Sequence, residues 1–232
     1  MTNWIKRKPT KLVTVGNVKV GDSNPISVQS MTNTNTCDVN GTINQINSLV
    51  AAGADIVRVS VPDKDSASAF KKIKKAVSIP LVADIHFDYM LAIEVADSAD
   101  CLRINPGNIG KEKKVIEVIN AAKHNGVPIR VGVNAGSLEK DLQKKYGEPN
   151  SDALVESAQR HIDILAKHDF DHYKMTGKGF ELGEVAWQQE DLNSVSFGRH
   201  EAEVGMGVSA GHSPLTCAQW RTAASPLLTC AQ

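Results

Sequence analysis

Short runs of apolar, mostly β-branched residues recur along the first 175 positions of the chain and are separated by stretches with helical spacing. Such runs, bounded by Gly, Pro, Asn or Asp, are typical of buried strands. We expect strands at residues 25–30, 56–61, 79–84, 101–105 and 129–134, and a sixth near 172–175.

The segments between these runs carry apolar residues at the spacing of one helix face. The segment before the second strand places Ile43, Ile46, Leu49 and Val50 on one stripe. Gly53 follows at a position typical of a helix C-cap. Similar stripes precede the third, fifth and sixth strands: Phe70, Ile73 and Val77; Val115, Ile116, Ile119 and Ala122; Leu154, Ala158, Ile162 and Leu165.

Strands that start about 20 to 45 residues apart, each followed by a helix, predict βαβ units on a parallel sheet. The first strand is not followed by Gly-x-Gly-x-x-Gly, which favours an α/β fold of the (β/α)8 TIM-barrel type over a doubly wound sheet. A closed barrel needs eight strands. About five to six βα units are recognisable, so we expect an incomplete barrel.

The pattern changes at about residue 175. Residues 176–232 are rich in glycine, show no sustained periodicity, and contain a near-duplicate of 213–219 at 225–232. We therefore predict a partial TIM-barrel substrate-binding domain at 1–175, followed by an unrelated or frameshifted, poorly ordered tail at 176–232. An ordinary C-terminal extension with weak patterning is the alternative.

Composition excludes several classes of protein. Lys plus Arg equals Asp plus Glu, 26 each, so no basic excess indicates nucleic-acid binding. The N-terminus has no apolar signal region, and no window approaches the roughly 18 apolar residues of a membrane span. Four scattered cysteines fit a reduced, cytoplasmic protein.

Polar residues at the ends of the predicted strands carry the candidate chemistry, because barrel enzymes place their sites at the carboxyl ends of the strands. Arginines stand inside three apolar strands, and each shares a face with a polar residue two or four positions on. Asp84 ends the third strand, His86 follows it, and Gln29 lies at the end of the first. The same-face sets are Arg58 with Ser60, Arg103 with Asn105, and Arg130 with Gly132 and Asn134.

Two explanations for the arginines remain open, since a buried and unpaired guanidinium would cost several kcal/mol. Each arginine pairs with a local carboxylate such as Asp84, or the three converge on an anionic ligand. Guanidinium groups suit bidentate contact with phosphate oxygens, and three on neighbouring strands favour a phosphate-bearing substrate. His86 is either an acid or base, or a hydrogen-bonded structural residue.

Several of these segments resemble a known family. They are Val-Gln-Ser-Met-Thr-Asn-Thr at 28–34, Gly-Ala-Asp-Ile-Val-Arg-Val-Ser-Val-Pro at 53–62, and the segments at 80–89, 101–110 and 128–142. Together they resemble the bacterial 4-hydroxy-3-methylbut-2-enyl diphosphate synthase family of isoprenoid biosynthesis, with a likeness that runs from about Arg7 to Tyr173.

The resemblance implies a barrel that binds 2-C-methyl-D-erythritol 2,4-cyclodiphosphate and opens its ring by a two-electron reduction with loss of water. In that family a separate C-terminal domain carries a [4Fe-4S] cluster, flavodoxin or ferredoxin donates electrons, and the enzyme is a homodimer. The implied catalytic residues are His86 and Asp84. The implied substrate-binding residues are Arg58, Arg103, Asn105, Arg130 and Asn134. We add Gln29 to them because it lies at the end of the first predicted strand.

The chain departs from the family after Tyr173. The Cys-x-x-Cys that begins the cluster motif is missing, and Cys217 and Cys230 have no partners at the required spacing, so we predict no metal site in this chain. The family has a substrate-binding lysine on its sixth strand, but the neighbours of Lys178 do not match, and we do not expect it in the site.

We therefore predict that the chain alone is inactive and, with open sheet edges, marginally stable. The alternatives are an inactive product of a disrupted gene, and a cluster-free phosphate-binding barrel enzyme resembling dihydropteroate synthase.

Overall fold

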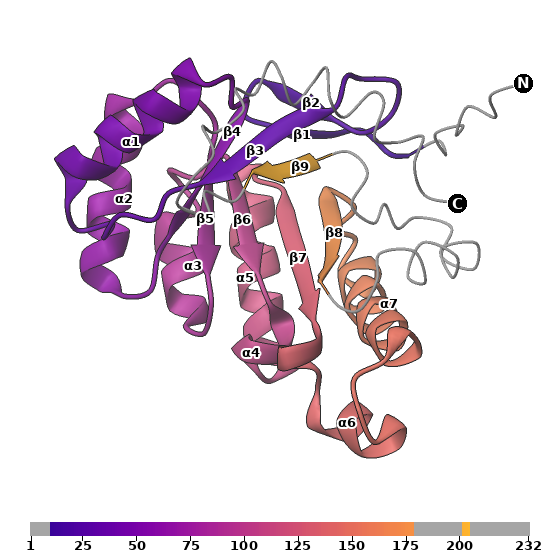
Figure 1. Ribbon diagram of the computed structural model, residues 1–232. Coiled ribbons are helices and arrows are strands. Elements are labelled where there is room, and N and C mark those ends of the chain that lie inside the picture. The colour runs from indigo at the N-terminus through magenta and orange to yellow at the C-terminus, as the bar shows by residue number, and fades with distance from the viewer. Residues whose placement is uncertain (1–9, 179–200, 205–232) are drawn as a thin grey trace, which may run out of the picture.

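The computed structural model describes residues 10–178 and 201–204 and shows a curled parallel sheet with helices on its convex face (Figure 1). The sheet has the strand order β8-β7-β6-β5-β4-β3-β9, and every neighbouring pair is parallel. Its strands are β3 (Ser27–Met31), β4 (Ile56–Ser60), β5 (Leu81–Ile85), β6 (Cys101–Ile104), β7 (Ile129–Asn134), β8 (Tyr173–Lys178) and β9 (Glu201–Val204). The prediction of an incomplete TIM barrel is confirmed, and all six expected strands are present.

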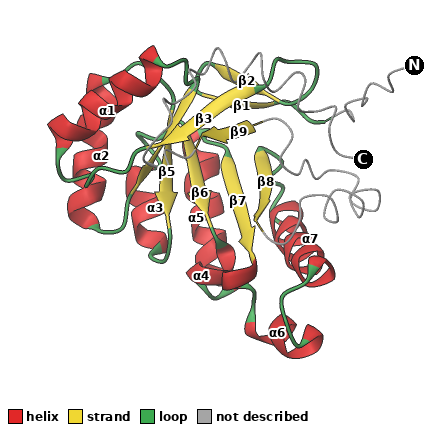
Figure 2. Cartoon of the chain, viewed as in Figure 1, coloured by secondary structure: helices red, strands yellow, loops and turns green. Residues whose placement is uncertain are grey.

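Helices connect successive strands, as the apolar stripes predict (Figure 2). The longer ones are α1 (Val39–Ala51), α2 (Lys64–Ala76), α5 (Glu112–Asn125) and α7 (Ser151–Lys167). The shorter ones are α3 (Tyr89–Val95), α4 (Pro106–Ile109), the 3-10 turn η1 (Ala135–Ser137) and α6 (Lys140–Tyr146). Within the described residues, none of these helices has the length and apolar character to cross a membrane.

Side-chain caps fix where four of these helices begin. Asp38, Asp63, Asp88 and Asn150 precede α1, α2, α3 and α7, and the side chain of each accepts a hydrogen bond from a backbone N–H of the first turn. Such a cap satisfies one of the N–H groups that the helix itself leaves without a partner. The starts of these helices are therefore set by local sequence, whereas their orientation is set by the apolar stripe.

Residue parity divides the strands between the core and the concave face. Val57, Val59 and Val61 on and after β4 belong to the large apolar cluster that also contains Phe70 of α2. The cluster continues with the residues of the same parity on the next strands: Leu81, Ala83 and Ile85; Leu102 and Ile104; Ile129, Val131 and Val133. Because side chains alternate along a strand, the residues between them, which include all three arginines, point away from the helices.

A short hairpin packs against the N-terminal ends of the sheet strands. The periodicity of the sequence does not predict it. It consists of β1 (Val13–Val15) and β2 (Val18–Val20), which are antiparallel. Its valines form a second apolar cluster with residues from β4, β5 and β6, and the members of that cluster are Val15, Val20, Ile56, Val82 and Cys101. The Thr14 N–H also donates to Nε2 of His172, just before β8, at 3.4 Å. The hairpin therefore closes the end of the sheet opposite the predicted site.

The segment predicted as a tail is described only in part. β8 extends past the predicted boundary at residue 175 and ends at Lys178. β9, which lies within the predicted tail, pairs with β3 on the side away from β4. The remaining tail residues, 179–200 and 205–232, lie outside the described residues. The boundary at 175 and the poor order of the tail stay predictions.

Candidate functional site

The register of the sheet places polar and charged residues in one row across five strands. Ser60 of β4 is aligned with Asp84 of β5, which is aligned with Arg103 of β6. The row continues to Arg130 of β7 and Lys174 of β8. All five have the parity that points away from the helix layer, so they share the concave face.

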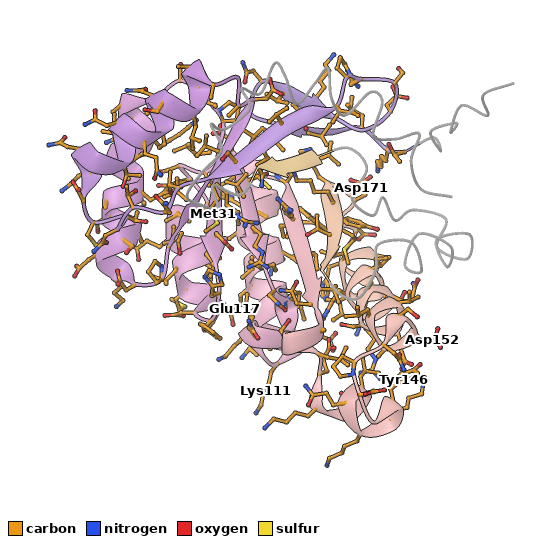
Figure 3. All side chains as sticks on the ribbon, in the orientation of Figure 1. Met31, Lys111, Glu117, Tyr146, Asp152 and Asp171 are labelled. Carbon is orange, nitrogen blue, oxygen red and sulfur yellow. The ribbon has the colours of Figure 1, made fainter. Side chains whose placement is uncertain are left out.

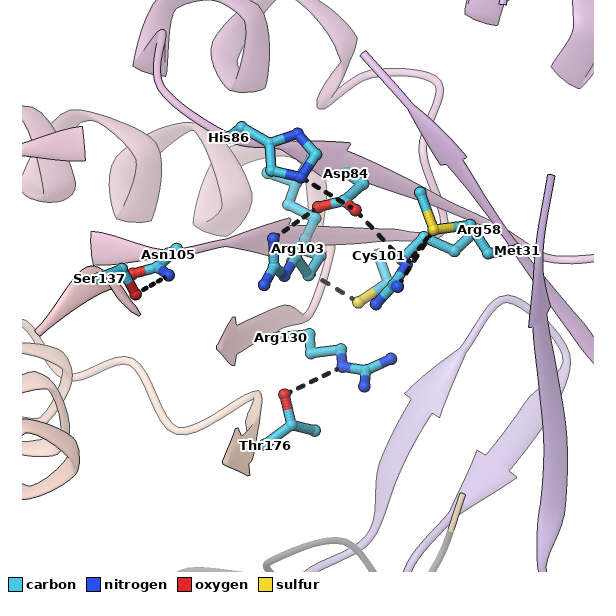
Figure 4. A network of polar contacts seen from close by, with 11 residues as sticks. Met31, Arg58, Asp84, His86, Cys101, Arg103, Asn105, Arg130, Ser137 and Thr176 are labelled. Carbon is cyan, nitrogen blue, oxygen red and sulfur yellow. Dashed lines mark hydrogen bonds and ion pairs between the residues drawn. The ribbon is translucent and has the colours of Figure 1, made fainter. Parts of the chain in front are cut away.

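Asp84 is the centre of this row. Its carboxylate is 2% exposed and contacts two guanidinium groups, Nη1 of Arg103 at 3.0 Å from Oδ1 and Nε of Arg58 at 3.4 Å from Oδ2. Nε and Nη2 of Arg58 also lie 3.2 and 3.1 Å from the sulfur of Met31 (Figure 4). Two arginines from β4 and β6 are thus held in fixed orientations by one acid between them.

Arg130 supplies the third guanidinium of the concave face. It is 5% exposed, and its Nε donates to Oγ1 of Thr176 on β8 at 3.3 Å. Gly132, two residues further along β7, leaves space for its neighbour: a Cβ there would lie 2.8 Å from Nη2 of Arg103. The absence of a side chain at Gly132 therefore allows Arg103 to extend across β7.

His86 lies just beyond the end of β5, close to Asp84. Its Nε2 is 3.7 Å from Oδ2 of Asp84, and 39% of its side chain is exposed. The adjacent Phe87 is 71% exposed, with its ring centre 6.2 Å from that of His86. His86 is therefore the member of the group with the most solvent access, at the carboxyl end of the strands where a ligand would enter.

Two asparagines lie at the same end of β6 and β7. Nδ2 of Asn105 donates to Oγ of Ser137, and that hydroxyl donates to the backbone oxygen of Asn134 at 3.3 Å. No periodicity or parity in the sequence singles out Ser137, although its place shortly after a strand bearing Asn134 is a signal for it. The segment after Asn105 forms the short helix α4.

Gln29 and Lys178 differ from expectation in their placement. Gln29 is fully buried, but β3 continues to Met31, so Gln29 lies in the middle of the strand and not at its end. Its register partner on β4 is Ile56, two residues before Arg58. Lys178, which we did not expect in the site, is aligned with Asn134 at the carboxyl end of β8.

The two explanations offered for the arginines are compatible. Arg58 and Arg103 do pair with Asp84, as the first explanation requires. Arg130 stands in the same row and bonds a neutral hydroxyl in the contact described above. Arg103 and Arg130 of the row, with Arg58 two residues before Ser60, thus present guanidinium donors from three strands to one concave face, which is the arrangement that phosphate recognition uses.

The cysteines of the described residues are not arranged for a cluster. Cys37 is exposed in the loop after β3, whereas Cys101 is buried at the start of β6, at the opposite end of the sheet. In the described part of the chain, no three His, Cys, Asp or Glu side chains gather as metal ligands would. Cys217 and Cys230 lie outside it.

Comparison with known proteins connects this geometry to a family. Residues 10–196 match the family described as the GcpE TIM-barrel domain. The chain is 63% identical over 179 residues to the 4-hydroxy-3-methylbut-2-en-1-yl diphosphate synthase (flavodoxin) of Hahella chejuensis. It is 64% identical over 177 residues to the enzyme of the same name from Acinetobacter baumannii. These alignments cover 77% and 76% of this chain, but the chain spans only 48% of each relative.

Solved structures resemble the chain in fold at low sequence identity. A type I 3-dehydroquinate dehydratase from Clostridium difficile gives a TM-score of 0.67 at 12% identity, covering 94% of this chain and 98% of that one. The dihydropteroate synthase of Yersinia pestis gives 0.53 at 14% identity, covering 78% and 70%. Identities this low show a shared barrel architecture and nothing about activity.

Proposed function

Because the chain belongs to the GcpE TIM-barrel family, we propose that it is the substrate-binding part of a 4-hydroxy-3-methylbut-2-en-1-yl diphosphate synthase. The whole enzyme would reduce 2-C-methyl-D-erythritol 2,4-cyclodiphosphate in the cytoplasm, opening the ring with loss of water. A [4Fe-4S] cluster, with ligands beyond this chain, would supply the electrons it receives from flavodoxin or ferredoxin, and the enzyme would act as a homodimer.

The observation that carries this proposal is the set of guanidinium groups from β4, β6 and β7 on one concave face. Arg58, Arg103 and Arg130 would bind the diphosphate oxygens and stabilise negative charge on the leaving oxygen. This assignment requires little reorganisation, because Asp84 already orients two of them. A buried, preoriented donor contributes more to binding than a flexible surface one.

The remaining site residues have narrower roles in the proposal. The side-chain amides of Asn105 and Asn134, with Gln29 deeper in the sheet, would bind the polar groups of the sugar-like carbon skeleton. His86, which is the solvent-accessible member, would exchange a proton at the mouth of the pocket. Both oxygens of Asp84 contact arginines, which supports an orienting role alongside the predicted catalytic one.

The alternative of a cluster-free barrel enzyme resembling dihydropteroate synthase is supported only by fold likeness at 14% identity. The 63% identity to diphosphate synthases carries far more information about the site, since it extends over 77% of this chain. A product of a disrupted gene remains the other alternative. The nucleotide sequence around codon 175 distinguishes it, because another reading frame there would continue the sequence of the relatives.

Calorimetric titration of the chain with 2-C-methyl-D-erythritol 2,4-cyclodiphosphate tests the proposal. We expect saturable binding, and we expect Arg130→Gln to weaken it by about ten- to a hundredfold, the value of one or two charge-assisted hydrogen bonds. Arg160→Gln is the matched control. It removes the same charge from α7, where Arg160 pairs with Asp141 and Glu156, and it should leave the affinity unchanged.

Thermal unfolding of each variant separates loss of binding from loss of fold. A wild-type chain that folds cooperatively but does not bind the cyclodiphosphate would contradict the proposal. Binding of a pterin phosphate in its place would support the dihydropteroate synthase alternative.

A further inference from the structure

Behind the site, a buried glutamate–histidine pair joins the segment after β7 to helix α7. Oε1 of Glu139 lies 2.8 Å from Nε2 of His161, and the two side chains are 20% and 10% exposed. A carboxylate can only accept, so Nε2 of His161 carries the hydrogen and donates it. The contact therefore ties the residue just before α6 to the middle of α7.

The glutamate of this pair is ionised at neutral pH. Burial is the largest single effect on this carboxyl and would raise its pKa. The hydrogen bonds from His161, from its own backbone N–H and from the Ser157 hydroxyl together outweigh burial and lower the pKa of Glu139 to about 2. The pair is therefore a charge-assisted hydrogen bond inside the protein, which is stronger and more directional than a neutral one.

The pair is not built for stability alone. Oε2 of Glu139 and Nδ1 of His161 are both buried and have no hydrogen-bond partner within the described residues. Buried polar atoms that lack partners are costly, and an apolar pair of similar volume would hold two elements together at least as well. A polar pair is better suited to fixing one element in a single position relative to another.

The element it fixes leads directly to the predicted pocket. Glu139 lies two residues after Ser137, the hydroxyl that bonds both the side chain of Asn105 and the backbone of Asn134. Between them Leu138 is buried at 4% exposure. The carbonyl of Ser137 also packs closely on α4, where a Cβ at Gly107 would come within 2.2 Å of its oxygen. Displacement of Glu139 would therefore move the groups that hold both asparagines.

We infer that Glu139 and His161 are positioning residues, which hold the segment 135–139 in place and thereby set Asn105 and Asn134 for the ligand. This inference rests on the proposed function for its ligand. Both residues act through Ser137, since their hydrogen bond fixes the segment that bears its hydroxyl.

A second link between α6 and α7 provides a comparison at the surface. Tyr146 of α6 (Figure 3) donates to Oε2 of Glu156 on α7 at 2.7 Å, and Arg160 bonds Glu156 at 3.0 Å and pairs with Asp141. This surface link connects α6 itself to α7, whereas the buried pair connects the residue just before α6 to α7. It does not include the segment that bears Ser137, so breaking it tests helix association without disturbing the pocket.

The experiment compares three variants of the 232-residue chain. His161→Leu removes the donor at similar volume, His161→Gln restores a donor at the position of Nε2, and Arg160→Gln breaks part of the surface link. Hydrogen exchange of peptides covering 134–139 reports on the segment without any ligand. Calorimetric titration with the cyclodiphosphate reports on the pocket.

We expect His161→Leu to lose protection at 135–138 and to bind the cyclodiphosphate about tenfold more weakly, because small displacements of positioning groups have effects of this size or larger. His161→Gln should recover most of both properties, and Arg160→Gln should match the wild type. Unchanged protection in His161→Leu overturns the inference. So does lost protection with unchanged affinity, which would make the pair merely structural.

Failure of the proposed function gives a different result. If the wild-type chain does not bind the cyclodiphosphate, that function is refuted, and exchange at 135–138 alone decides whether the pair fixes the segment. Global unfolding of His161→Leu would be visible as loss of protection in the strands β4 and β5. In that case, the comparison of His161→Gln with the wild type at 135–138 decides whether the donor at position 161 is what holds the segment.

Discussion

At the scale of single residues, Gly132 links the packing of the sheet to the geometry of the pocket. It is on β7 between Arg130 and Asn134, and it faces Arg103 on the neighbouring strand. Sequence parity places Gly132 on the polar face but does not explain why glycine stands there. The explanation is the guanidinium of Arg103, which occupies the volume that a side chain at position 132 would need.

Gly132→Ala is expected to weaken the cyclodiphosphate affinity by about tenfold and to lower the free energy of unfolding by only about 1 kcal/mol. The added methyl would lie 2.8 Å from Nη2 of Arg103, and the flexible guanidinium would move away from Asp84 to relieve the contact. Calorimetric titration and urea unfolding measure the two effects separately.

Gly136→Ala is the matched control for this substitution. A Cβ at Gly136 meets nothing within 4 Å, so the same chemical change a few residues away should leave affinity and stability nearly as in the wild type. Equal affinity for Gly132→Ala and wild type would show that the position of Arg103 does not matter for the ligand.

At the scale of elements, the strands and helices of the sheet follow from the sequence because each signal is local. Apolar runs and stripes specify the six βα strands, and alternation within each strand assigns Arg58, Arg103 and Arg130 to one face. Contacts between distant segments do not follow in this way. Ser137 bonds Asn105 across 32 positions, and His161 reaches Glu139 from another helix, which no local pattern encodes.

The periodicity of the sequence does not predict the hairpin β1–β2, for a different reason. Its strands are three residues each, too short for periodicity to register, and the remaining signal is the two-residue turn Gly16-Asn17. Gly16 has a φ of +57°, the left-handed conformation that such turns require and that glycine adopts without strain. A turn of this type between two valine-rich triplets is therefore the local signal that indicates the hairpin.

Val15→Ala should destabilise the chain by about 2 kcal/mol and leave ligand affinity unchanged. Val15 is fully buried and clusters with Ile56 and Val82, so its truncation loses two methyl groups and leaves a cavity. The hairpin contacts the amino ends of the strands, whereas His86, Asn105 and Asn134 lie at their carboxyl ends. Urea unfolding and calorimetric titration test both parts of the prediction.

Val50→Ala provides the comparison for that experiment, since Val50 on α1 is 45% exposed and its truncation should change stability by less than about 0.5 kcal/mol. If the Val15→Ala variant is fully folded but binds the cyclodiphosphate much more weakly, the hairpin also shapes the binding site.

At the scale of the whole molecule, the two ends of the sheet differ in kind. One end is closed by an apolar hairpin, and the other presents Asn105, Asn134 and His86, with the arginines along the concave face between the two ends. The chain as a whole has no net charge, with 26 basic and 26 acidic residues. Any attraction for a diphosphate is therefore local to the concave face, where the guanidinium groups are partly screened from solvent.

The same division of the molecule separates the two cysteines of the described residues. Cys101 is fully buried among Val15, Val20 and Val82 at the hairpin end, while Cys37 is exposed at the opposite end of the sheet. The sequence has four cysteines, and these are two of them. They cannot bind one cluster together unless β6, the strand that bears Arg103, unfolds. A [4Fe-4S] cluster needs four ligands close together, and no such group is present within residues 10–178 and 201–204.

We therefore expect the 232-residue chain to bind the cyclodiphosphate without reducing it. The test is an anaerobic assay with iron and sulfide for reconstitution, a chemical reductant in place of flavodoxin, and chromatographic detection of the ring-opened diphosphate. Because binding and reduction are located in different parts of the enzyme under this proposal, calorimetric binding should persist in the same preparation. Turnover at the rate of a full-length relative would mean that this chain supplies its own electron-transfer centre. It would contradict the proposal that this chain binds the substrate while another part of the enzyme supplies the electrons.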